Sequence, residues 1–273
     1  MSTIDEMLSR LRNVKPALPK NLPDSMRYAA VLCLMYPTSS ISPSLRTKGS
    51  SDKEPEDLNV ILTLRSSSMR SHAGDVSFPG GRQDEGEDNW ATALREANEE
   101  IGFPYDYGPG LERICEMPHY LSKNNLLVTP CLAYSAVDPY EHGWRPEASV
   151  DEVQEIFSIR LSDISRGEGY DGRWMAWYAL SWRLHQFFLP GTPYPFSSAE
   201  KKRIWGLTAR MLVDISRIAF DRAPEYEFED EVGDKRRIMK ALEEGTFGKL
   251  GRQEKERAEA TGEGQIVVVL CTA

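Results

Sequence analysis

The fold is decided by Phe78–Phe103, which reads FPGGRQDEGEDNWATALREANEEIGF. A glycine-rich loop comes first, and no residue from Asp88 to Ile101 breaks a helix. At about 100° per residue, Glu96, Glu99 and Glu100 fall on one narrow arc of that helix. The adjoining arc is apolar and consists of Trp90, Ala93, Leu94, Ala97 and Ile101. The stretch therefore predicts a helix that buries one face and presents three carboxylates beside a glycine loop.

The three carboxylates make this helix face unfavourable on its own, because like charges three or four residues apart cost roughly 0.2–0.5 kcal/mol per pair. A divalent cation turns that cost into a binding site. Oxygen ligands without cysteine or histidine suit Mg²⁺ or Mn²⁺, and the Gly80 carbonyl is available to complete the metal shell. The loop is not a Walker A motif, since Gly81 is not followed by G-K-[ST]. A second interpretation stays open at this point, namely a solvated helix face in a chain with 42 acidic residues.

The spacing of the whole stretch resembles that of the Nudix hydrolases. Every fixed position of the pattern G-x5-E-x7-R-E-U-x-E-E-x-G-U is matched, by Gly81, Glu87, Arg95-Glu96, Glu99-Glu100 and Gly102. The resemblance implies the α/β fold class, specifically a Nudix α/β/α sandwich with a mixed sheet. It also implies Mg²⁺-dependent hydrolysis of a nucleoside diphosphate linked to another group.

The same resemblance assigns roles to five of these residues. Glu96, Glu99 and Glu100 are the implied metal ligands, and one of them acts as the base, with Glu99 as the candidate. Arg95 would orient the carboxylates by ion pairing. Glu87 would support the loop or a further ion. Glu99, Arg95 and Glu87 are thus the candidate catalytic residues.

A second pattern lies just upstream and resembles the coenzyme A diphosphatase branch of that family. The signature L-L-T-x-R-[SA]-x3-R-x3-G-x3-F-P-G-G is matched, except for Ile61 in place of the first Leu, by Ile61–Ser66, Arg70, Gly74 and Phe78–Gly81. The resemblance implies coenzyme A or an acylated derivative as substrate, with 3',5'-ADP and 4'-phosphopantetheine as products. Arg65, Arg70 and Lys123 are candidate phosphate partners, since arginine binds phosphate in bidentate geometry. Gly80 and Gly81 would line the substrate site beside them.

Several alternatives remain open from the residues alone. Arg65 and Arg70 also fit ordinary surface ion pairs, and His72 fits a loop residue better than a catalyst. Glu152 is either a distal acid near the metals or a structural residue before the next strand. The same catalyst would also suit another nucleoside diphosphate, such as ADP-ribose, NADH or an oxidised dNTP.

The apolar runs predict one domain in which a mixed sheet is covered by helices. Residues 1–26 are expected to hold a short helix and a proline-rich lead, 27–224 the Nudix domain, and 225–273 a charged, partly disordered tail. Residues 37–57 are expected to form a mobile loop insert. Strands are expected at Tyr28–Tyr36, Leu58–Arg65, Leu111–Pro118, Leu126–Ala136, Ile156–Leu161, Trp174–Leu180 and Trp182–Phe188, and a helix over Ser198–Phe220.

The charge balance excludes some partners. Lys and Arg number 33 against 42 Asp and Glu, and the net charge of -9 argues against a protein held to nucleic acid by bulk charge. No apolar run approaches the ~20 residues of a membrane span. The expected partner is a small molecule, and neither nucleic acid nor a membrane is expected. The patterns leave the oligomeric state open.

The cysteines and the N-terminal residues give indications of the cellular compartment. The four cysteines, Cys33, Cys115, Cys131 and Cys271, are widely spaced, which is typical of free thiols in a reducing compartment. Residues 1–13 lack the apolar run of a secretory signal, and Thr3 and Glu6 instead fit a capping box. A peroxisomal location follows only from the resemblance; otherwise the chain is expected in the cytosol or mitochondria.

Overall fold

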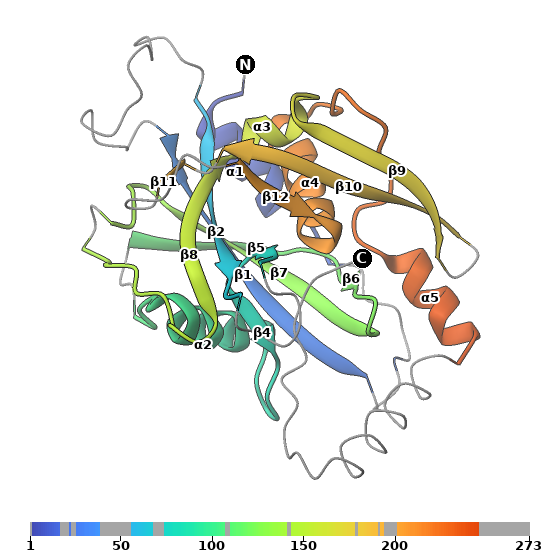
Figure 1. Ribbon diagram of the computed structural model, residues 1–273, viewed down its shortest axis with the longest axis horizontal. Coiled ribbons are helices and arrows are strands. Elements are labelled where there is room, and N and C mark those ends of the chain that lie inside the picture. The colour runs from blue at the N-terminus through green and yellow to red at the C-terminus, as the bar shows by residue number, and fades with distance from the viewer. Residues whose placement is uncertain are drawn as a thin grey trace.

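The structure is a computed structural model, and it describes residues 2–16, 22, 26–38, 56–67, 74–106, 110–140, 143–177, 180–190, 192–193 and 201–245. Its elements, in chain order, are α1 (Ile4–Arg12), β1 (Arg27–Pro37), β2 (Leu58–Arg65), β3 (Val76–Ser77), β4 (Gly80–Arg82), α2 (Asn89–Ile101), β5 (Leu111–Glu116), β6 (Tyr120–Leu121), β7 (Leu126–Ser135), β8 (Val153–Arg160), α3 (Leu161–Ser165), β9 (Tyr170–Trp177), β10 (Leu180–Pro190), β11 (Thr192–Pro193), β12 (Lys201–Trp205), α4 (Gly206–Phe220) and α5 (Lys235–Glu243) (Figure 1).

Two sheets organise the described part of the chain. The larger follows the order β11-β8-β2-β1-β7-β5, with β3 beside β2, β4 beside β1 and β6 beside β7; the smaller follows β12-β10-β9. In the larger sheet β1 and β7 pair in parallel, whereas β1 pairs antiparallel with β2 and β4. The predicted mixed sheet is therefore confirmed. β1 is central and buried on both faces, which explains why it reads as an uninterrupted apolar run.

The two faces of the larger sheet carry different layers. Along β1, Ala30 and Leu32 belong to the apolar cluster around α2, while Val31 and Cys33 belong to the cluster of α1, α3, α4 and the smaller sheet. This alternation follows from the two-residue period of a strand. Figure 1 shows α2 and α4 on opposite sides of the larger sheet. The predicted α/β/α layering is thus present.

One predicted helix boundary is wrong. The sequence predicted a helix over Ser198–Phe220, but Lys201–Trp205 forms β12, which pairs antiparallel with β10. Lys202 and Ile204 are buried while Lys201 and Arg203 are exposed, so the period is that of a strand. Gly206, at a φ of 62°, then turns the chain into α4. Residues 198–200 lie outside the described residues.

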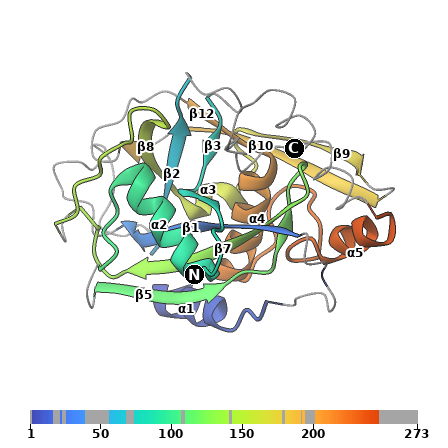
Figure 2. The same ribbon diagram turned by 90° about the horizontal axis from the view of Figure 1, so that it is seen from below.

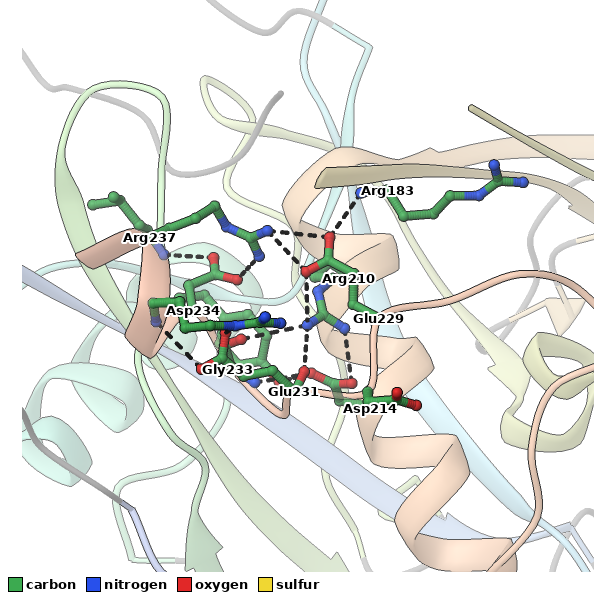
Figure 3. Close-up of polar contacts among 12 residues, drawn as sticks. Arg183, Arg210, Asp214, Glu229, Glu231, Gly233, Asp234 and Arg237 are labelled. Carbon is green, nitrogen blue, oxygen red and sulfur yellow. Dashed lines mark hydrogen bonds and ion pairs between the residues drawn. The ribbon is translucent and has the colours of Figure 1, made fainter. Parts of the chain in front are cut away.

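The chain remains folded beyond residue 224, where the composition predicted the start of a tail. A buried charged network holds residues 229–237 against α4 (Figure 3). Arg210 pairs with Asp214 at 2.9 Å, and the Gly233 amide donates to Asp214 at 3.1 Å. Arg237 contacts Glu229 at 2.8 Å. Part of the expected tail, up to residue 245, therefore belongs to the domain, and 246–273 lie outside the described residues.

Smaller expectations can also be compared with the structure. α1 begins with the predicted reciprocal capping box, in which the Glu6 amide donates to the Thr3 hydroxyl and the Thr3 amide donates to the Glu6 carboxylate. Cys33, Cys115 and Cys131 are free thiols, and Cys271 lies outside the described residues. None of the helices in the described ranges combines the length and apolar character that a membrane crossing requires. Of the expected loop, residues 39–55 lie outside the description.

Candidate active site

The carboxylate-bearing helix is α2, and its ends are fixed locally. The Asp88 carboxylate accepts the Ala91 amide at 2.7 Å as N-cap, and Gly102, at a φ of 65°, forms the left-handed C-cap. Ala93, Ala97 and Ile101 are fully buried, and the glutamates lie on the adjoining arc of the helix. The predicted helix and its buried face are confirmed.

The glycine loop lies directly against β1 and α2, which explains both glycines. A Cβ at Gly80 would lie 2.5 Å from the Ala30 carbonyl oxygen, and one at Gly81 would lie 2.1 Å from the Glu96 carboxyl carbon. Gly80 also has a φ of 153°, which favours glycine. Its amide donates to the Glu100 carboxylate at 3.0 Å. The loop backbone and two of the three glutamates are therefore in contact.

Arg95 links the carboxylates on the solvent side of the helix. Its guanidinium contacts Glu87 at 2.7 Å, Glu96 at 3.0 Å and Glu99 at 3.3 Å, and it donates to the Arg82 carbonyl at 2.9 Å. The hydrogen bond from Arg95 lowers the pKa of Glu87 to about 2. Glu87 in turn accepts the Asp84 amide, which closes the loop. The geometry agrees with the orienting role expected for Arg95, while the catalytic roles of Arg95 and Glu87 stay predictions.

Glu100 is the buried member of the carboxylate set. Its side chain is 3% exposed, and burial raises its pKa to about 8 despite the Arg65 guanidinium 3.5 Å away. Burial likewise raises the pKa of Glu96, and the Glu152 carboxylate raises the pKa of both Glu96 and Glu100. Glu152 therefore lies close enough to affect the charge of the predicted metal ligands. This agrees with the alternative in which Glu152 is a distal acid near the metals. Glu99 is the exposed member, at 57%.

These side chains fit a hard divalent cation in their chemistry. Burial first, and neighbouring carboxylates in addition, raise the pKa of Glu96 and Glu100, and a nearby cation lowers such pKa values. Among the described residues, however, no three acidic, cysteine or histidine side chains converge on one point as a ready metal site. Glu96 and Glu99 are instead paired with Arg95. Metal binding would require these two carboxylates to turn away from the guanidinium.

The predicted substrate residues are distributed unevenly. Arg65 ends β2 and lies at the carboxylate cluster, because its guanidinium pairs with Glu100. Lys123 is an exposed residue of the loop between β6 and β7, and no contact joins it to the glutamates. Arg70 and His72 lie outside the described residues. No pattern in the sequence indicates the Arg65–Glu100 pair, since 35 positions separate the two residues and the fold brings the end of β2 to α2.

Comparison with known proteins agrees with this architecture. The sequence profile of the NUDIX domain matches residues 51–178. An uncharacterized Nudix hydrolase NudL of Enterobacter sp. (strain 638) is 30% identical over 227 residues, which cover 78% of this chain and 93% of that protein. The peroxisomal coenzyme A diphosphatase NUDT7 of Mus musculus is 26% identical over 179 residues, covering 65% of this chain and 70% of that protein.

A relative from Arabidopsis thaliana is matched over a smaller share of its length. Nudix hydrolase 15, mitochondrial, is 31% identical over 173 residues, which cover 62% of this chain. The matched region spans 56% of that relative, so this chain corresponds to about half of it. The Arabidopsis relative is named as mitochondrial and the mouse relative as peroxisomal.

Proposed function

The chain belongs to the Nudix hydrolase family, and we propose that it hydrolyses the diphosphate bond of coenzyme A and its derivatives to 3',5'-ADP and 4'-phosphopantetheine. The observation that carries this proposal is the pairing of Arg65 with Glu100 at 3.5 Å. Arg65 comes from the coenzyme A diphosphatase signature and Glu100 from the Nudix motif, so the two patterns meet at one site. The similarity to a mouse coenzyme A diphosphatase supports the same substrate.

The proposed cofactor is Mg²⁺ or Mn²⁺, because Nudix hydrolases generally use divalent metal ions and the side chains at this site offer oxygen ligands. Glu96, Glu99 and Glu100 would hold the ion, with the Gly80 carbonyl as a further oxygen. A bound ion of this kind supplies charge neutralisation for the diphosphate and lowers the pKa of a coordinated water.

The protein residues would then have separate roles in the hydrolysis. Glu99 is the candidate base, since it is the exposed carboxylate of the three and accessible to a water. It would take the proton of the water whose oxygen attacks one phosphorus, while the bond from that phosphorus to the bridging oxygen breaks and the other phosphate leaves. Arg95 would hold Glu87 in place, while Glu96 and Glu99 turn from its guanidinium toward the ion. Arg70 and Lys123 remain candidate phosphate contacts.

A hydrolysis panel tests the proposal. The chain is assayed with Mg²⁺ and with Mn²⁺ on coenzyme A, ADP-ribose, NADH and 8-oxo-dGTP, and coenzyme A is expected to have the highest kcat/KM. Glu99→Gln is expected to abolish most of that turnover. Glu85→Gln, which changes an exposed glutamate of the loop before α2, is the matched control and should keep it. A higher kcat/KM on any of the other three substrates would overturn the assignment to coenzyme A.

A peroxisomal location belongs to the same proposal, since the similar mouse enzyme is named as peroxisomal. Fluorescence microscopy of the full chain with an N-terminal tag, against a peroxisomal marker, tests it.

A further inference from the structure

A cavity of about 230 Å³ lies on the outer face of the smaller sheet, and none of the three motif glutamates lines it. The register pairs Phe187 with Ile204, both of which are buried in the core, and Gln186 with Trp205 on the opposite face. The cavity is lined by Asp171, Gly172, Arg173, Leu184, Gln186, Arg203 and Trp205. It therefore combines two guanidinium groups, an amide and an indole on one sheet face.

The two arginines of this cavity are not engaged by acids. Arg203 donates to the Gln186 amide oxygen at 2.7 Å and lies 4.3 Å over the Trp205 ring. In the described ranges no acidic side chain lies within ion-pair distance of Arg203 or Arg173. The only acid of the lining, Asp171, accepts a hydrogen bond from Gln186 at 3.4 Å. In a chain with a net charge of -9, two guanidinium groups without an acidic partner among the described residues favour an anionic ligand.

A short series of contacts joins this cavity to the carboxylates. The Trp205 indole donates to the Asp75 carboxylate at 2.9 Å, and the Asp75 carbonyl accepts the Arg65 amide at 2.9 Å. Arg65 in turn pairs with Glu100. Figure 2 shows β12 next to β3, close to the end of β2. The cavity and the carboxylate cluster are thus joined through Asp75 and Arg65.

We propose that this cavity binds the phosphorylated nucleoside end of the substrate, with Trp205 stacking on the base and Arg173 and Arg203 meeting a phosphate outside the scissile diphosphate. An indole with a guanidinium above it is a platform for a planar base, and guanidinium groups bind phosphate by charge-assisted hydrogen bonds. For coenzyme A this group is the 3'-phosphate. The inference rests on the proposed function. It removes Arg65 as the 3'-phosphate partner, because that side chain is 5% exposed and engaged with Glu100.

Binding of two ligands that differ only in the 3'-phosphate tests the cavity without turnover. Isothermal titration in Mg²⁺ compares 3',5'-ADP with 5'-AMP. Arg203→Gln and Arg173→Gln are expected to weaken binding of 3',5'-ADP by about tenfold or more and to leave 5'-AMP within about twofold. Trp205→Leu should weaken both ligands. The control is Arg113→Gln, since Arg113 is also an exposed arginine, 5.1 Å over the Trp90 ring, and lies in β5 of the other sheet.

The outcomes separate this inference from the proposed function. A wild type that binds the two ligands equally, or arginine variants that bind 3',5'-ADP as wild type does, would overturn the cavity assignment. Loss of 3',5'-ADP binding in Arg113→Gln to the same extent would overturn it as well. A chain that leaves coenzyme A intact, but loses 3',5'-ADP preference in Arg203→Gln, would retain the cavity and refute the proposed substrate. If coenzyme A is hydrolysed, the kcat/KM ratio of coenzyme A to dephospho-coenzyme A should fall about tenfold in the arginine variants.

Discussion

A methyl group added at Gly81 would test whether the glycine loop positions a catalytic carboxylate. Its Cβ would lie 2.1 Å from the Glu96 carboxyl carbon, whereas ordinary contact begins at 3.4 Å, so the carboxyl must move by 3.4 − 2.1 = 1.3 Å. The group that moves is the far end of a flexible side chain, and the fold can accommodate it. A misplacement of about 1 Å at a reacting site costs roughly a hundredfold in rate. We expect Gly81→Ala to lower kcat by about that factor and to change Tm by at most about 3 °C.

Gly80→Ala is the matched control, because the same methyl group there meets backbone. Its Cβ would lie 2.5 Å from the Ala30 carbonyl oxygen and 2.5 Å from the Val31 Cα, and neither atom can move alone. Backbone strain at the positive φ costs roughly 1–3 kcal/mol, and overpacking a similar amount. The strain and the overpacking together lower the free energy of unfolding by about 4 kcal/mol, so Tm is expected to fall by roughly 8–16 °C.

The two variants are compared by thermal unfolding and by steady-state hydrolysis of the preferred substrate at saturating Mg²⁺. The reasoning predicts opposite profiles, a stable but slow Gly81→Ala and an unstable Gly80→Ala. Wild-type kcat in Gly81→Ala would refute the contact between the loop and Glu96 as a determinant of rate. A Tm loss in Gly81→Ala equal to that in Gly80→Ala would refute the claim that the side chain can yield.

Two further predictions concern charge. Glu99→Gln and Glu100→Gln are each expected to lower kcat by roughly a hundredfold and to reduce the rise in Tm that Mg²⁺ gives the wild type; a near wild-type kcat in either variant would remove that residue from the metal site. His185 is 0% exposed, and burial lowers its pKa from 6.5 to about 3, so it is neutral in the fold and protonated in the unfolded chain below pH 6.5. Its contribution to stability is therefore complete above pH 6.5 and is lost as the pH falls toward 3; at pH 5, which lies 1.5 pH units below 6.5, the loss is about 2 kcal/mol. The free energy of unfolding in urea, measured between pH 7 and pH 5, should depend less steeply on pH in His185→Gln than in the wild type. Some dependence should remain, because burial also lowers the pKa of His119 to about 4. An unchanged slope would contradict this account.

The sequence predicted those parts of the fold that depend on neighbouring residues. α2 and its carboxylate arc follow from helical spacing within Asn89–Ile101, and the capping box of α1 follows from Thr3 and Glu6. β1 follows from an apolar run long enough for a fully buried strand. In each case the physical cause is local, so the pattern was sufficient.

The parts of the structure that the sequence did not predict depend on residues that are distant in the sequence. The charged residues of β12 resemble the start of a helix. The segment forms a strand because its backbone pairs with Gln186–Pro190 of β10. Residues 229–237 are rich in charge, which is typical of a tail, but Arg210 and Asp214 of α4 compensate that charge inside the fold. The contact of Arg65 with Glu100 has the same origin, since it joins the end of β2 to a residue of α2 far along the chain.

The part of the chain after the matched NUDIX region completes the core and carries residues of the proposed substrate cavity. Phe187, Ile204 and Leu212 lie beyond residue 178 and belong to the same apolar cluster as Val31 of β1. Removing one partner from a buried ion pair such as Arg210–Asp214 leaves an uncompensated charge, at a cost of about 3–5 kcal/mol. The network of Figure 3 therefore ties residues 229–237 to α4, and α4 follows β12 directly. Because β12 carries the indole that contacts Asp75, the chemistry and the proposed recognition of the substrate come from different parts of one folded domain.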